Sequence, residues 1–106
     1  MVNGESVRND LAKIKPLYAE KGIVLIGVFG SVARGENDPF SDIDVAYTLE
    51  AEAFSRHFPD GFGKVLELQG LKERLEAMFH GKVDLVSLQS GDPDFLQRIK
   101  EEMIYV

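Results

Sequence analysis

The sequence contains no cysteine and no tryptophan, and only four prolines among its 106 residues. The absence of cysteine excludes disulfide bonds and thiolate metal sites. Positive charge is also scarce, because 12 Lys and Arg stand against 18 Asp and Glu and leave a net charge of -6. A surface of this sign repels polyanions, so we expect no direct binding of nucleic acid through a basic face.

Long apolar runs are missing as well. The longest run, Ile23–Phe29, is far shorter than the roughly 20 residues that a membrane span needs. The first ten residues also lack the apolar stretch of a secretion signal. We therefore expect no membrane association, a cytoplasmic location and one compact domain over residues 1–106.

The spacing of apolar residues alternates along the chain between helical and extended patterns. Pro16 is expected to end or kink the first helix or to start a new turn, and residues 49–62 give no clear pattern. The spacing predicts, in order, a helix from about Glu5, strands at Ile23–Phe29 and 42–48, a helix with an apolar stripe over 65–78, a strand at 82–88, a short helix from Pro93 and a small strand within 103–106.

The first strand is followed at once by Gly30 and Ser31, and then by a segment that is compatible with a helix. Where a strand is followed by a tight turn and a helix, the backbone N–H groups at the helix N-terminus point outward. A glycine in the turn lets a phosphate approach these groups closely. Taken alone, a Gly-Ser pair is more often a simple turn. Arg34 alone is equally uninformative.

Asp42 and Asp44 lie two residues apart in a predicted strand, so they share a face with Cα atoms about 6.5 Å apart. Two like charges directed at one point suit a hard cation such as Mg²⁺. Asp84, on another predicted strand, would complete a site for two ions about 3.5–4 Å apart if the two strands are neighbours. The alternative is that Asp42 and Asp44 mark an exposed strand end.

Together these residues resemble the polymerase-beta-like nucleotidyltransferase superfamily, and specifically its minimal branch. The resemblance rests on Gly30-Ser31, ten intervening residues, Asp42-x-Asp44 and a later Val-Asp-Leu-Val segment that holds Asp84. It extends over the order of helices and strands from about residue 5 to 88. It implies an α/β (α+β) nucleotidyltransferase fold, with a short mixed β-sheet of three to four strands flanked by helices.

The resemblance also implies a reaction, in which AMP passes from ATP to an acceptor hydroxyl and pyrophosphate leaves. The implied cofactor is a pair of Mg²⁺ ions. In the implied roles, Asp42 and Asp44 hold both ions, Asp84 binds the ion on the acceptor side, Gly30 and Ser31 bind the β- and γ-phosphates, and Arg34 is a weaker phosphate ligand.

Minimal members of this superfamily are typically encoded beside a HEPN-domain protein, a helical RNase that acts as a toxin. The resemblance implies that this chain is the antitoxin and attaches AMP to a tyrosine of that partner. Two alternatives stay open. One is a catalytically inactive antitoxin that binds nucleotide or blocks its partner sterically, and the other is a transferase for a small molecule such as an aminoglycoside, although relatives of that kind carry an additional domain.

Two further residue groups have ordinary structural interpretations. Phe54, Phe58 and Phe62 are spaced by four and straddle Pro59, which favours core or loop packing over a partner-binding patch. The two histidines, His57 and His80, lack partners at zinc-ligand spacing, so surface or helix-end positions are expected for them.

Overall fold

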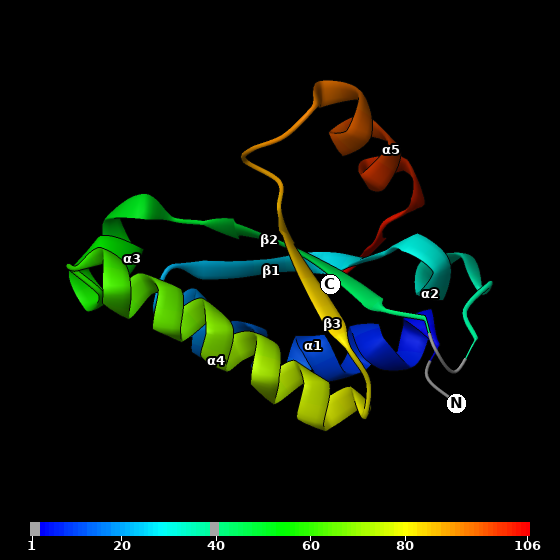
Figure 1. Cartoon of the computed structure of the whole chain (residues 1–106), viewed down its shortest axis with the longest axis horizontal. Helices are drawn as coiled ribbons and strands as arrows, with labels where there is room; N and C mark the ends of the chain where they lie inside the picture. Colours follow the sequence, from blue (N-terminus) through cyan, green and yellow to red (C-terminus); the bar gives the residue numbers. More distant parts are fainter. Residues whose placement is uncertain (1–2, 39–40) are drawn as a thin grey trace.

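A computed structural model describes residues 3–38 and 41–106 and shows a four-stranded sheet with helices on both faces (Figure 1). The chain thus has the mixed α+β architecture that the sequence predicts. The elements in chain order are α1 (Gly4–Ala19), β1 (Ile23–Phe29), α2 (Gly30–Arg34), β2 (Ile43–Leu49), α3 (Ala51–His57), α4 (Gly61–Phe79), β3 (Val83–Ser87), α5 (Pro93–Glu102) and β4 (Ile104–Tyr105).

The strands lie in the order β3-β2-β1-β4. Strand β1 is antiparallel to β2 and to β4, whereas β2 and β3 are parallel. A parallel pair needs a long return connection, and α3 and α4 supply it. The sheet is therefore mixed, and β3 lies at one of its edges.

Helices α1 and α4 cover one face of the sheet and enclose the main core (Figure 1). Asn3 and Ser6 form a capping box at the start of α1, which satisfies backbone donors that a helix leaves free. Pro16 lies inside α1 and does not end it. The main core is made of buried apolar side chains from the helices α1–α4 and the strands β1–β3: Val7, Leu11, Ile14, Tyr18, Ile23, Leu25, Val28, Val32, Ile43, Val45, Phe54, Leu71, Leu75, Phe79 and Val83.

Residues 49–62, which the sequence left unassigned, contain α3 and the start of α4. The side chain of Asp60 caps α4 by accepting a hydrogen bond from the Gly63 amide at 2.6 Å. The apolar stripe expected from residue 65 does not lie wholly in the core, because Val65 is 65% exposed. Helical spacing shows that residues share a face, but not whether another element covers that face.

The predicted packing of the three phenylalanines is confirmed for two of them. Phe54 is buried, and the Phe58 ring lies with its centroid 5.3 Å from the Phe54 ring. The prediction is wrong for Phe62, which is 73% exposed at the start of α4. His57 ends α3 and His80 caps the C-terminus of α4, so both histidines occupy helix ends as expected.

Helix α5 packs on the opposite face of the sheet, through a small second core of Phe29, Ala46, Ile99 and Met103 (Figure 1). Asp92 caps this helix and Pro93 is its first residue, as the sequence predicts. Asp44 is half-buried and Asp84 is exposed, so α5 leaves part of this face open. In the described part of the chain, no helix combines the length and the apolar character needed to cross a membrane.

Candidate active site

Helix α2 begins directly where β1 ends, and the junction packs against β2. Gly30 has a φ of +76°, a left-handed conformation that favours glycine. A Cβ atom added to Gly30 would overlap the carboxylate of Asp44. Phe29 pairs with Asp44 across the antiparallel strands. The Gly-Ser turn expected from the sequence therefore packs against Asp44, one of the predicted site residues.

Asp44 and Asp84 are direct partners in the register of the parallel strands β2 and β3. Residues in register on neighbouring strands point to the same face, so these two predicted site residues are brought together on the face that α5 partly leaves open. Asp42 is not part of this register, because it lies outside β2. The strand expected to begin at Asp42 begins at Ile43, and Asp42 is exposed just before it.

Asp44 has a raised pKa. Burial and neighbouring negative charge raise it to about 6 from an ordinary value of 3.8. Burial is the largest cause. The charges of Asp84, Asp42 and Glu102 follow, while Arg34 acts in the opposite direction. Asp42, Asp84 and a fourth carboxylate, Glu102, thus all lie close enough to influence Asp44.

The residues fit Mg²⁺ by donor type and by charge. Within residues 3–38 and 41–106, no three carboxylate or imidazole side chains form a complete ready-made metal site. Mg²⁺ is commonly bound by one or two carboxylates and completes its shell with water and substrate phosphates, so a preformed cage of three is not required. Part of the raised pKa of Asp44 comes from the negative charges of its neighbours, and a bound cation would offset these charges.

The pKa of Asp44 predicts how its charge affects stability in metal-free buffer. The pKa of Asp44 is higher in the folded chain than in the unfolded chain. Asp44 therefore contributes most to the free energy of unfolding below about pH 4, and this contribution is lost as the pH rises through about 6. Asp44→Asn should therefore raise the free energy of unfolding at pH 7.5 by about 1–2 kcal/mol, allowing for screening of this half-exposed group. Urea unfolding with EDTA at pH 7.5 and 4 should show this difference shrinking on acidification. A difference that grows instead contradicts the assignment.

Glu102, at the end of α5, is a site residue that the sequence did not reveal. The Gly30 amide donates a hydrogen bond to Glu102 Oε1 at 3.0 Å, and Arg34 Nη1 donates to Glu102 Oε2 at 2.7 Å. Arg34 Nε donates to Glu36 at 2.9 Å. The Gly30 amide and the Arg34 guanidinium are both predicted to bind phosphate. Both already donate hydrogen bonds to carboxylates of the chain itself. No local motif marks Glu102, which is 72 residues from Gly30.

Two separate hollows border the predicted site residues. One, of about 230 Å³, lies between α2 and α5 and is lined by Gly30, Arg34, Arg98 and Glu102, among others. The other, of about 280 Å³, lies between β3 and α4, and Asp84 contributes to its wall. The first hollow lies on the α5 side of the sheet, as do Asp44 and Asp84, whereas the second lies on the α4 side. Asp44 itself lies next to both Gly30 and Asp84.

Comparisons with known proteins agree with this fold. The family model described as polymerase beta, nucleotidyltransferase matches residues 12–106. A Methanocaldococcus jannaschii protein, named provisionally as a protein adenylyltransferase, is 36% identical over 103 residues, which are 96% of this chain and 92% of the relative. The protein adenylyltransferase MntA of Thermococcus cleftensis is 31% identical over 107 residues, covering 100% of this chain and 98% of that protein.

A solved structure is also similar. It is described provisionally as a minimal nucleotidyltransferase, and it superposes with a TM-score of 0.70 at 29% sequence identity. The match covers 98% of this chain and 96% of the other.

Proposed function

Because this chain belongs to the polymerase beta nucleotidyltransferase family and is a nucleotidyltransferase, we propose that it transfers AMP from ATP to a hydroxyl group of a partner protein in a Mg²⁺-dependent reaction. The observation that carries the proposal is the pairing of Asp44 with Asp84, beside a glycine turn that packs on Asp44. We also propose that residues 1–106 act as one domain.

In the proposed reaction, the acceptor oxygen forms a bond to the α-phosphorus of ATP. The bond between that phosphorus and the oxygen bridging the α- and β-phosphates breaks, and pyrophosphate leaves. The proton of the acceptor hydroxyl passes to Asp84. Two Mg²⁺ ions, held by Asp42, Asp44 and Asp84, would supply charge stabilisation for the phosphates and for the attacking and leaving oxygens.

The strand order β3-β2-β1 supports a division of roles between the residues, because it places Asp44 of β2 between Asp84 of β3 and the Gly30 turn after β1. Gly30 and Arg34 border the hollow beneath α5 and are proposed, with Ser31, to bind the β- and γ-phosphates. Asp84 lies on β3, on the other side of Asp44 from Gly30, and is proposed to serve the acceptor. Asp44 lies between the two groups, where a ligand shared by both metal ions is needed.

This division predicts different effects of Asp84→Asn on binding and on turnover. The dissociation constant for ATP with Mg²⁺ should change by no more than about three-fold, because the phosphates bind on the other side of Asp44. The turnover rate should fall by at least about a hundred-fold, because the acceptor loses its proton acceptor. Calorimetric titration and single-turnover transfer measure the two quantities. Loss of ATP binding with turnover retained would reverse the proposed roles.

The proposed acceptor is a tyrosine of a HEPN-type helical RNase toxin, which would make this chain an antitoxin. The similar proteins named protein adenylyltransferases support a protein as acceptor. A chain with a net charge of -6 is attracted to the basic surface of an RNA-cleaving protein. AMP attached there would add a phosphate charge that repels RNA, so the modification itself would inhibit the toxin.

The proposal is tested with ATP labelled on the α-phosphate or on the γ-phosphate, together with a HEPN-domain protein as the proposed partner. The α-label should appear on that partner when Mg²⁺ is present, and EDTA should abolish its transfer. The γ-label should not appear on the partner. Transfer of the γ-label would indicate phosphorylation, and a partner that is inhibited without any label would favour the steric alternative.

A further inference from the structure

Glu102 lies where an anionic ligand would be expected. Its two carboxylate oxygens accept hydrogen bonds from the Gly30 amide at 3.0 Å and from the Arg34 guanidinium at 2.7 Å. These are a backbone N–H group and a cation, the same donor types that bind phosphate oxygens. A carboxylate of the chain therefore occupies donors that suit a phosphate.

The surroundings of Glu102 leave room for such a ligand. The hollow of about 230 Å³ between α2 and α5 contains Glu102 in its wall together with Arg34 and a second cation, Arg98. Helices α2 and α5 meet at the same end of the sheet (Figure 1). Arg98 lies one helical turn before Glu102 on α5, so side chains at these positions face the same region.

Resting on the function proposed above, we propose that Glu102 competes with the β- and γ-phosphates of the nucleotide for Gly30 and Arg34, and that Arg98 binds those phosphates once Glu102 has moved aside. Glu102 then lowers the affinity for nucleotide, because without nucleotide its carboxylate stays hydrogen-bonded to the Gly30 amide and paired with Arg34. Binding must replace two charge-assisted hydrogen bonds within the chain by hydrogen bonds to the phosphates. The Glu102 charge also repels the incoming ligand.

The test is calorimetric titration with ATP and, separately, with inorganic tripolyphosphate, both in Mg²⁺. Glu102→Gln should lower both dissociation constants by about ten-fold, because it removes a negative charge next to the phosphates and keeps the side-chain shape. Arg98→Gln should raise both by about three-fold or more. The two substitutions should thus change the dissociation constants in opposite directions, whereas a general loss of structure would weaken binding in both variants.

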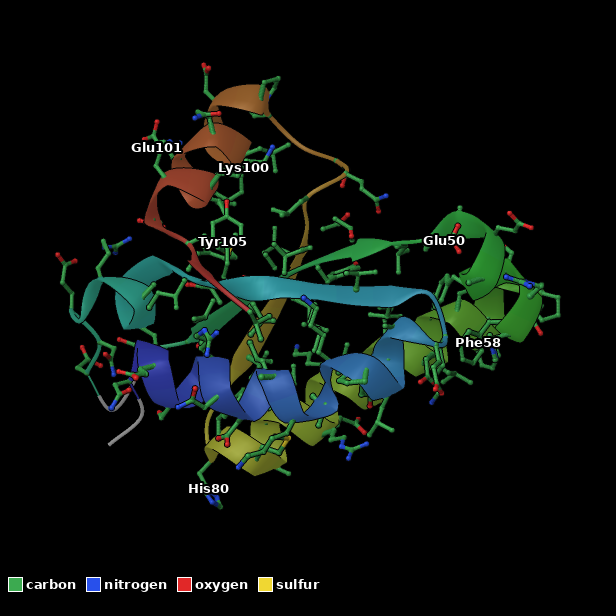
Figure 2. All side chains as sticks on the ribbon, turned by 180° about the vertical axis from the view of Figure 1, so that it is seen from behind. Glu50, Phe58, His80, Lys100, Glu101 and Tyr105 are labelled. Carbon is green, nitrogen blue, oxygen red and sulfur yellow. The ribbon has the colours of Figure 1, made fainter. Side chains whose placement is uncertain are left out.

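Glu101→Gln is the matched control. Glu101 is the neighbouring residue on α5, where it is exposed and accepts a hydrogen bond from Gln97 Nε2 at 3.3 Å (Figure 2). The substitution makes the same change in net charge. Its dissociation constants should stay within about two-fold of the wild type. Should Glu102→Gln fail to fold, Glu102→Asp keeps the charge but shortens its reach, and the dissociation constants should fall by less than ten-fold.

The outcomes separate this inference from the proposed function. If the wild type binds and transfers but Glu102→Gln binds with unchanged or weaker affinity, Glu102 is not a competitor and only this inference fails. If the wild type binds neither ATP nor tripolyphosphate and transfers no AMP, the proposed function fails as well. Tighter binding in Glu102→Gln, with Glu101→Gln unchanged, supports the competition.

Discussion

Asp44→Asn is expected to lower nucleotidyl transfer by at least on the order of a thousand-fold while the fold is retained. The substitution removes a ligand that we propose for both metal ions, and such a ligand is worth several kcal/mol in the transition state. The same change relieves repulsion from Asp84 and Asp42, so the variant should be no less stable than the wild type at neutral pH. Single-turnover transfer and urea unfolding measure the two effects on the same sample.

The matched control for Asp44→Asn is Asp10→Asn. Asp10 lies on α1, on the opposite face of the sheet from the proposed site, and pairs only loosely with Lys13 at 3.6 Å. This variant has the same change in net charge and should transfer AMP at the wild-type rate. Full activity of Asp44→Asn in a metal-replete assay, with a normal Asp10→Asn control, would exclude the two-metal assignment.

Gly30→Ala is the second variant with a large expected effect, a loss of transfer of at least about a hundred-fold. The new Cβ atom would overlap the Asp44 carboxylate. Because the overlapped atom is the end of a side chain, we expect that carboxylate to rotate away from its position beside Asp84. A displacement of about 1 Å at a reacting centre is enough to cost a factor of a hundred.

Gly35→Ala separates this steric effect from backbone strain. Gly35 has a φ of +73°, nearly the +76° of Gly30, but a Cβ atom there would meet nothing within 4 Å. Both variants should lose about 1–2 kcal/mol of stability from the left-handed conformation, measured by urea unfolding. Only Gly30→Ala should lose transfer. Equal activity losses in the two variants would show that strain, and not the position of Asp44, is responsible.

The sequence predicted the part of the site that depends on short-range patterns. A strand, the Gly30-Ser31 turn and a helix follow one another within a few residues, and Asp44 and Asp84 each lie on a recognisable strand. The sequence could not establish that these two strands are neighbours in register. That pairing depends on how α3 and α4 return the chain, and α3 lay in the segment with no readable pattern.

The parts that were missed depend on contacts between distant segments. Glu102 meets Gly30 only because α5 folds back over the sheet, and neither residue carries a local signal of that contact. Val65 has the spacing of a core residue, yet it is 65% exposed on α4. Periodicity identifies a face, whereas tertiary packing decides whether that face is buried.

The central claim is that this chain transfers AMP to its partner protein through Asp44 and its neighbouring aspartates. The most direct test is the intact mass of the proposed HEPN-domain partner after co-expression with the wild type or with Asp44→Asn. The account predicts a gain of one or more AMP units with the wild type and an unchanged mass with the variant. A partner that stays unmodified, yet is neutralised equally by both forms, would contradict transfer and leave steric inhibition as the function.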